Sequence, residues 1–161
     1  LHLGARGVAV EAALADQSLQ VLTSEETYTA APFSAERMFG LLQDALVEAR
    51  RHGRRVRTSG VMDWAARGHP GAGELPAYES KINLLVRKYG CSLLCIYDIS
   101  RLSGAQVMDV LSTHPMVIHR GQIRRNPYYD PPRELRQELL IGRDIRRGSR
   151  RPPSEEQNPI Q

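Results

Sequence analysis

The sequence predicts an α/β fold with a mainly parallel sheet flanked by helices. Short apolar runs that suit strands centre near residues 21, 57, 94 and 117, and the gaps between them contain segments with helical spacing. Strands that alternate with helices in this way are typical of βαβ units and a parallel sheet. The chain has 161 residues, which is enough for one domain with a proper core.

The elements before residue 60 follow from local patterns. Val8 to Ala15 predicts a short helix and Leu19 to Leu22 a strand. Ser34 is a suitable N-cap for the clearest helix in the chain, which runs to a stop at Gly53. Its apolar residues recur every three or four positions and form one stripe. Arg54 to Thr58 predicts the next strand, which ends at Ser59-Gly60.

The elements after residue 60 repeat the alternation. Glu74 to Tyr89 predicts a helix with Gly90 as its stop. Cys91 to Asp98 is an apolar run that ends in Tyr-Asp, which suits a strand buried on both faces of a parallel sheet. Ser103 caps a third helix that ends near His114-Pro115, and Met116 to Ile118 predicts a further strand.

The end of the chain has a different composition. We expect one folded domain over residues 1–132, and an Arg-rich helix with a disordered tail over residues 133–161. Because the sequence opens on Leu1 and not on Met, we expect a fragment of a longer protein.

Charge and cysteine content narrow the class of protein. The formal net charge of +4 permits contact with nucleic acid without requiring it, and we expect none. Since no apolar run reaches the length of a membrane span, we expect no membrane contact. Cys91 and Cys95 would lie about 13 Å apart on a strand, too far for a disulfide. Two buried thiols indicate a reduced, cytoplasmic protein.

Polar and aromatic side chains follow two neighbouring predicted strands. Ligands of parallel sheets gather outside the carboxyl ends of the strands, so these side chains are candidates for a small-molecule pocket. The alternative is that Met62, Trp64 and Tyr97 are core residues that pack a helix against the sheet. The candidate ligand-binding residues are Thr58, Ser59, Met62, Trp64, Tyr97 and Asp98.

Motifs of several enzyme and cofactor classes are missing from the sequence. There is no phosphate-binding Gly-x-x-x-x-Gly-Lys-Ser/Thr run and no Gly-x-Gly-x-x-Gly. The histidines and cysteines do not form ligand pairs at metal-binding spacing, and His114 and His119 would need a third partner. His114 itself should lie near the edge of the sheet opposite the pocket unless the loop is long. We therefore predict no metal, no cofactor and no catalysis.

Two further arrangements receive an ordinary interpretation. Ser59, His114 and Asp98 could form a catalytic triad on paper, but the sequence has no nucleophile elbow. The arginine-rich cluster of residues 50–57 could attract phosphate, yet it resembles a solvated helix end stabilised by the helix dipole.

Several stretches together resemble the MEDS domain, a sensory domain of methanogen and methylotroph regulators of the dichloromethane-regulator type. They occur in the family's order between residues 8 and 132. The matching stretches are residues 8–14, 19–22, 25–28, Thr58-Ser59-Gly60-Val61-Met62-Asp63-Trp64-Ala65, Arg67-Gly68, Tyr78-Glu79, Asn83, Cys95-Ile96-Tyr97-Asp98, Thr113-His114-Pro115 and Asn126-Pro127-Tyr128-Tyr129.

The resemblance implies a RecA- or KaiC-like fold used for sensing rather than hydrolysis. It implies a prokaryotic cytoplasmic module that binds a small organic ligand and acts with a signalling protein or output domain. Compared with the family pattern, the chain lacks about one strand-helix unit at its N-terminus, the unit that would bind phosphate in a RecA-like protein. Val61 also stands where family members often have an acidic residue.

Three functions remain open from the sequence. The first is a non-catalytic sensory, ligand-binding domain of a bacterial signalling or transcriptional regulator. The second is an interaction or homo-oligomerisation module that pairs through an open sheet edge. The third is a degenerate RecA-like nucleotide-binding protein, in which Asp98 would be essential.

Overall fold

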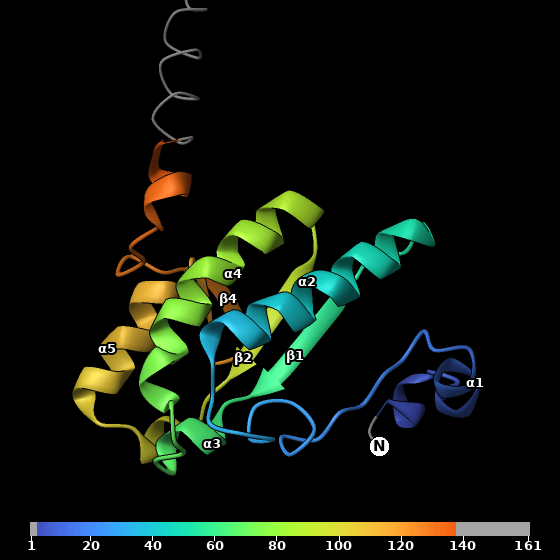
Figure 1. Ribbon diagram of the computed structural model, residues 1–161, viewed down its shortest axis with the longest axis horizontal. Helices are drawn as coiled ribbons and strands as arrows, with labels where there is room; N and C mark the ends of the chain where they lie inside the picture. The colour runs from blue at the N-terminus through green and yellow to red at the C-terminus, as the bar shows by residue number, and fades with distance from the viewer. Residues whose placement is uncertain (1–2, 138–161) are drawn as a thin grey trace, which may run out of the picture.

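The computed structural model describes residues 3–137, in which helices cover a small parallel sheet and a separate hairpin lies beside them (Figure 1). The larger elements in chain order are α1 (Val10–Ala15), α2 (Ala35–Arg51), β1 (Arg57–Val61), α3 (Asp63–Ala66), α4 (Leu75–Tyr89), β2 (Ser92–Ile96), α5 (Gly104–Thr113), β3 (Met116–His119) and β4 (Gln122–Arg125). These helices and the small parallel sheet agree with the α/β class predicted from the sequence, although the parallel sheet has only two strands among the described residues.

The centre of the fold is one βαβ unit. β1 and β2 pair in parallel, from Arg57 opposite Ser92 to Val61 opposite Ile96. The connection between them passes through α3 and α4, as parallel neighbours require. α4 ends at Gly90, whose φ of 61° is the left-handed conformation that glycine adopts without strain.

The helices begin where the sequence predicts. The Ser34 side chain accepts a hydrogen bond from the Arg37 backbone N–H and caps α2. Ser103 and Gln106 form a reciprocal capping box at the start of α5. α2 and α4 pack against each other across one face of the sheet, and α5 packs against α4 (Figure 1).

The strand predicted at Leu19 to Leu22 is absent from the structure. Residues 20–23 have no regular secondary structure, and the Val21 and Leu22 side chains are exposed. Polar side chains bind the backbone on both sides of this stretch: Asp16 accepts from the Ser18 N–H, and Thr23 and Glu26 bind each other's backbone N–H. Such local bonds offer the backbone an alternative to strand pairing.

The predicted fourth strand does not join the parallel sheet. β3 instead pairs antiparallel with β4 through a two-residue turn, Arg120-Gly121. Both turn residues have positive φ, of 50° and 73°. This combination matches the twist of an antiparallel hairpin, so β3 is satisfied by its immediate neighbour in the chain.

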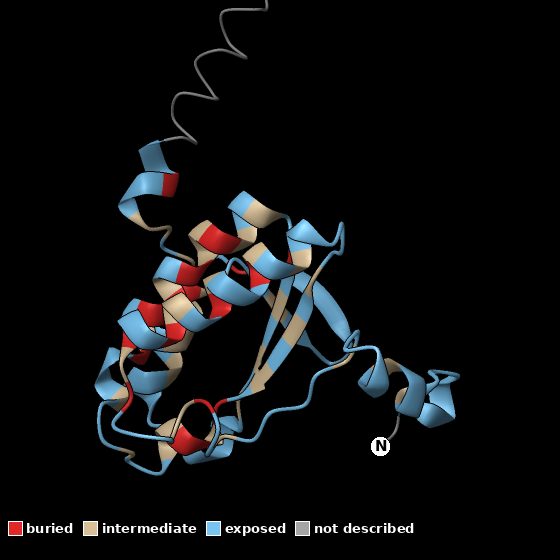
Figure 2. Ribbon diagram, turned by 45° about the vertical axis from the view of Figure 1, so that its right-hand side comes forward, coloured by how far each residue is buried: buried red, intermediate tan, exposed pale blue. Residues whose placement is uncertain are grey.

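The prediction that β2 is buried on both faces is also wrong. Leu93 and Cys95 face the helices and are half-buried, whereas Leu94 and Ile96 on the other face are 43% and 45% exposed. Figure 2 shows the same alternation of intermediate and exposed residues along both strands. The described residues therefore leave one face of the β1–β2 sheet open to solvent.

An aromatic cluster closes the core at the carboxyl end of β1. Trp64 stacks on Tyr28 with ring centroids 5.3 Å apart, and Phe33 lies 4.7 Å from Trp64 and 5.8 Å from Tyr78. Gly71 permits this packing, because a Cβ on it would lie 2.2 Å from the Phe33 carbonyl oxygen. The cluster fixes the long segment between α1 and α2 against the sheet.

The C-terminal prediction falls largely outside the described residues. Residues 133–137 are helical and Leu135 is buried. The rest of the helix expected from residue 133 onward and the predicted tail lie beyond residue 137. Among the described residues, no helix is both long and apolar enough to cross a membrane.

Candidate functional site

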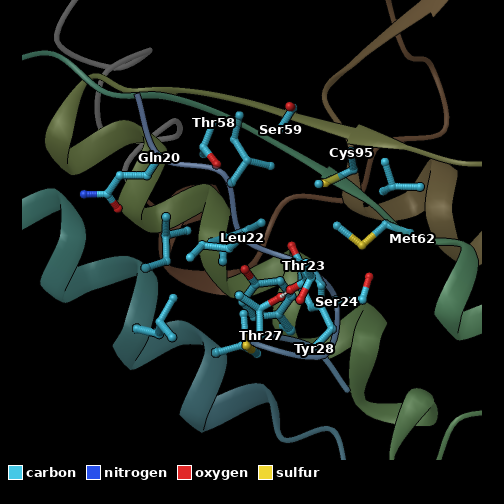
Figure 3. A pocket seen from close by; sticks show the side chains of 18 residues that line it. Gln20, Leu22, Thr23, Ser24, Thr27, Tyr28, Thr58, Ser59, Met62 and Cys95 are labelled. Carbon is cyan, nitrogen blue, oxygen red and sulfur yellow. Dashed lines mark hydrogen bonds between the residues drawn. The ribbon is translucent and has the colours of Figure 1, made fainter. Parts of the chain in front are cut away.

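A cavity of about 420 Å³, here called the main cavity, lies at the predicted site. It lies between the segment 20–28, α2, α4 and the helix-covered face of β1 and β2 (Figure 3). Its lining residues are Gln20, Leu22, Thr23, Ser24, Thr27, Tyr28, Met38, Leu41, Leu42, Thr58, Ser59, Gly60, Val61, Met62, Tyr78, Ile82, Leu93 and Cys95.

The position of the segment 20–28 depends on two close contacts. A Cβ on Gly60 would lie 2.6 Å from the Tyr28 hydroxyl oxygen and 2.7 Å from the Met62 terminal carbon, so only glycine lets the Tyr28 ring approach β1. Farther along, the Arg37 guanidinium donates a hydrogen bond to the Thr27 carbonyl oxygen over 3.1 Å and ties the segment to α2.

Three of the predicted ligand-binding residues line the main cavity. Thr58 and Met62 contribute side chains from β1 and from the turn that follows it. Ser59 belongs to the lining, but its hydroxyl points away from the other lining side chains (Figure 3), as alternation along a strand requires. Met62 both lines the cavity and is buried in the hydrophobic core.

Trp64 lies at a second cavity of about 420 Å³, here called the Trp64 cavity. Asp63, Arg67 and His69 also line it, from the part of the chain that follows β1, and Glu25 lines it from the segment 20–28. The indole N–H of Trp64 is buried and has no hydrogen-bond partner among the described residues. An indole N–H usually finds a partner when it is buried.

Asp98 and Tyr97 line neither cavity. The Asp98 carboxylate accepts hydrogen bonds from the Ser100 N–H and hydroxyl and pairs with Arg101 at 3.2 Å. These hydrogen bonds from Ser100 lower the pKa of Asp98. Asp98 therefore fixes the turn after β2.

The Tyr97 hydroxyl instead donates a hydrogen bond to a buried acidic residue, Glu79, which was not among the residues predicted from the sequence. Glu79 on α4 is only 1% exposed and accepts hydrogen bonds from the hydroxyls of Tyr97 and Thr113. The signal was present in the sequence, because Glu79 shares a helix face with Ile82 at three-residue spacing. A carboxylate on an apolar face needs buried partners.

His114 lies next to the same carboxylate, which corrects the prediction that it sits at the opposite edge of the sheet. Its Nε2 is 3.7 Å from the Glu79 Oε1, and its ring meets the Tyr97 ring edge-on at 6.0 Å. The prediction failed because it assumed that β3 continues the parallel sheet. β3 turns into a hairpin instead, and the end of α5 remains beside α4.

Burial governs the acid-base behaviour of this region. Desolvation raises the pKa of Tyr28 to about 12, with smaller contributions from Cys95 and Glu79. Desolvation, and next the neighbouring Glu79, also raise the pKa values of Cys95 and Tyr97. A thiol in this state is a weak nucleophile.

The structure does not support a catalytic triad of Ser59, His114 and Asp98, nor a phosphate site at the arginine-rich cluster. Ser59 is exposed on the open sheet face, while His114 and Asp98 hold the separate partners described above. In the cluster, Arg51 and His52 both pair with Glu48 on the same helix face and remain exposed. The cysteines are free thiols, as predicted.

Comparison with known proteins identifies the family. Residues 2–115 match the family described as MEDS, MEthanogen/methylotroph, DcmR Sensory domain. The chain belongs to the MEDS family. The match confirms the resemblance drawn from the ordered stretches, and it includes every residue that lines either cavity. No curated protein and no solved structure gave a match to this MEDS domain.

Proposed function

We propose that this MEDS domain is a non-catalytic sensory module that binds a small, uncharged organic molecule in the main cavity. The observation that supports the proposal most is the composition of the cavity wall. None of its lining residues is charged, while hydroxyls from three segments (20–28, β1 and α4) surround apolar side chains. Pockets for small molecules combine apolar walls with a few polar groups in this way.

Size and wall chemistry define the ligand class. A volume of about 420 Å³ is near the lower end for ligand pockets and suits a compact molecule. Leu22, Leu42, Met62 and Ile82 would contact its apolar part, and the Thr58 hydroxyl is available to a single polar group. Without a cation or a helix N-terminus in the wall, an anionic or phosphorylated ligand would lose its solvation without compensation.

The segment 20–28 gives the cavity a means of signalling. It has no regular secondary structure where it borders the cavity, and a ligand would contact it together with β1 and α2. A ligand that touches both sides stabilises the arrangement in which they are closed together, and shifts the population toward it. A change in this segment is accessible to a partner because Val21 and Leu22 are exposed.

We place the domain in a cytoplasmic signalling or transcriptional regulator, where an output domain or signalling protein reads the change, and we propose that it has no catalytic activity. The RecA-like origin inferred from the family belongs to the same proposal. The parallel β1–β2 pair with its α4 crossover is compatible with part of such a sheet.

One observation favours a second function, an interaction module that forms homo-oligomers. Val61, Leu94 and Ile96 expose apolar side chains side by side on the open face of the sheet. Light scattering on the chain with and without residues 133–161 tests this, since the interaction function predicts a dimer or larger species. A strict monomer in both forms contradicts it.

A thermal-shift screen tests the sensory function. Neutral small organic molecules should raise the melting temperature, whereas nucleotides should not. A ligand at 100 times its Kd should add about 2.7 kcal/mol to the free energy of unfolding. Leu22→Trp narrows the main cavity and should reduce the shift; Val21→Trp, the adjacent exposed residue outside the lining, should keep it. No stabilisation by any neutral compound contradicts the proposal.

A further inference from the structure

Three potential metal ligands converge behind the wall of the main cavity. Glu79 comes from α4, Cys95 from β2 and His114 from the residue that ends α5. One ligand atom of each lies within 4.8 Å of the other two. In a tetrahedral zinc site with bonds of about 2.0–2.3 Å the ligand atoms are roughly 3.3–3.8 Å apart. Small rotations of the side chains would therefore bring the three atoms to coordination distance.

The histidine ring is already oriented for coordination. Its Nδ1 lies 2.7 Å from the Val110 carbonyl oxygen, an acceptor, so Nδ1 carries the proton and donates it. In the neutral ring this leaves Nε2 with a free lone pair, 3.7 Å from Oε1 of Glu79. Metal-binding histidines almost always donate their other N–H to a carbonyl or carboxylate in this manner.

The spacing between His114 and Glu79 argues against a direct ion pair. A charged imidazolium bonded to a carboxylate would bring nitrogen and oxygen to about 2.7–2.9 Å. The observed distance of 3.7 Å between His114 Nε2 and Glu79 Oε1 is too long for a hydrogen bond. Two lone-pair donors facing each other at this distance in a buried place repel one another, whereas a cation between them attracts both.

The surrounding residues hold the carboxylate as the second shell of a metal site does. The Thr113 hydroxyl lies 3.0 Å from Glu79 Oε2, and the Tyr97 hydroxyl donates to Oε1. These partners fix the plane of a carboxylate that is almost completely buried. Such outer partners orient a ligating carboxylate and tune the metal.

We propose that Glu79, Cys95 and His114 bind one zinc ion, with a fourth coordination position on the side of the main cavity. A thiolate, an imidazole and a carboxylate form a donor set that suits borderline Zn²⁺ better than Mg²⁺ or Ca²⁺. A thiolate and a carboxylate together balance the charge of Zn²⁺, so the buried site is neutral overall. Cys95 lines the main cavity, which gives the ion a path of entry.

This site was not predicted from the sequence, because its ligands do not follow a local spacing motif. Residues 79, 95 and 114 are separated by 16 and 19 positions, and α4, β2 and α5 bring them together only in the folded chain. The zinc site stands apart from the proposed organic ligand. A chain that binds zinc and no organic molecule refutes only the sensory function, and the reverse result refutes only the zinc site.

Titration of the metal-free full chain with Co²⁺ and Zn²⁺ tests the proposal. Co²⁺ should bind one equivalent and give the charge-transfer band of a thiolate ligand with the strong d–d bands of tetrahedral cobalt. Zn²⁺ should abolish these bands and should slow alkylation of Cys95 at least tenfold. The proposal is overturned if the unmodified protein binds Co²⁺ without a thiolate band, or if it binds neither ion stoichiometrically.

Variants identify the ligands. Cys95→Ser should remove the charge-transfer band and weaken zinc binding at least a hundredfold, and His114→Gln and Glu79→Gln should weaken it at least tenfold. Cys91→Ser is the matched control, since Cys91 is the other free thiol and lies outside the cluster. Circular dichroism of each variant verifies folding. Zinc binding that survives Cys95→Ser but not Cys91→Ser contradicts the assignment.

Discussion

The close approach of Tyr28 to β1 makes Gly60 the most informative position for substitution. In Gly60→Ala the new Cβ would lie 2.6 Å from the Tyr28 hydroxyl and 2.7 Å from the Met62 terminal carbon, where ordinary contacts begin at 3.4 Å. Gly60 does not have a positive φ, so alanine causes no backbone strain there. The steric overlap therefore opposes the gain of about 0.5–1 kcal/mol that alanine usually brings in a strand.

The expected cost follows from this overlap. Overpacking costs about 1–3 kcal/mol, and we expect about 2 kcal/mol because Met62 is buried in the core and the Tyr28 ring is stacked on Trp64. For a chain of this size that corresponds to a fall of about 4–8 °C in Tm. The fluorescence of Trp64, the single tryptophan, should change as well because Tyr28 stacks on it.

Thermal unfolding followed by circular dichroism and by tryptophan fluorescence measures both effects. Gly40→Ala is the control: a Cβ there meets nothing within 4 Å, and alanine in the middle of α2 should stabilise the protein by about 0.5–1 kcal/mol. If Gly60→Ala leaves both Tm and the emission of Trp64 unchanged, Tyr28 does not lie against β1 and the main cavity has a different shape.

Three further substitutions probe the framework. Ser103→Ala removes the capping box of α5 and should cost about 1 kcal/mol in chemical denaturation, whereas Ser92→Ala on the open sheet face should cost almost nothing. Asn126→Asp should cost about 2–4 kcal/mol, because the buried Nδ2 donates to the Leu111 and His114 carbonyls and a carboxylate cannot; a loss under 1 kcal/mol contradicts this. Burial raises the pKa of Tyr28 to about 12, so its contribution to stability is complete below about pH 10 and is lost as the pH rises through 12. Tm should therefore fall more steeply between about pH 10 and 12, the ordinary and the raised pKa of this tyrosine, in the unmodified protein than in Tyr28→Phe, and equal slopes would contradict this.

The sequence predicted the elements that depend on local signals. Ser34 and Ser103 mark helix starts, and Gly90 marks a helix end, because capping needs only residues a few positions apart. The βαβ unit followed from alternation between strand and helix patterns. Family membership followed from the order of many short stretches, each of which is weak alone.

The errors came from long-range pairing. An apolar run such as Leu19 to Leu22 forms a strand only if a partner strand is available, and the run itself does not reveal one. Met116 to Ile118 is a strand, but the turn Arg120-Gly121 determines that its partner is β4 rather than β2. The exposed face of β2 was missed for the same reason, since a continuous apolar run implies burial on both faces.

The site was predicted in part. Thr58, Ser59 and Met62 line the main cavity, since they lie at the end of a correctly predicted strand. The opposite wall, including Leu22 and Tyr28, comes from a segment whose course was predicted incorrectly. Glu79 was missed because a single charged residue on the apolar face of a helix does not indicate a site until its hydrogen-bond partners are known.

The central claim is that a neutral organic molecule occupies the main cavity. The most direct measurement is nuclear magnetic resonance of the ¹⁵N-labelled chain during titration with the best compound from the thermal-shift screen. Binding in the main cavity predicts saturable chemical-shift changes concentrated in three separate segments, residues 20–28, 38–42 and 58–62, which meet only at this cavity. Saturable shifts confined to the open sheet face around Leu94 and Ile96, or none at all, would contradict it.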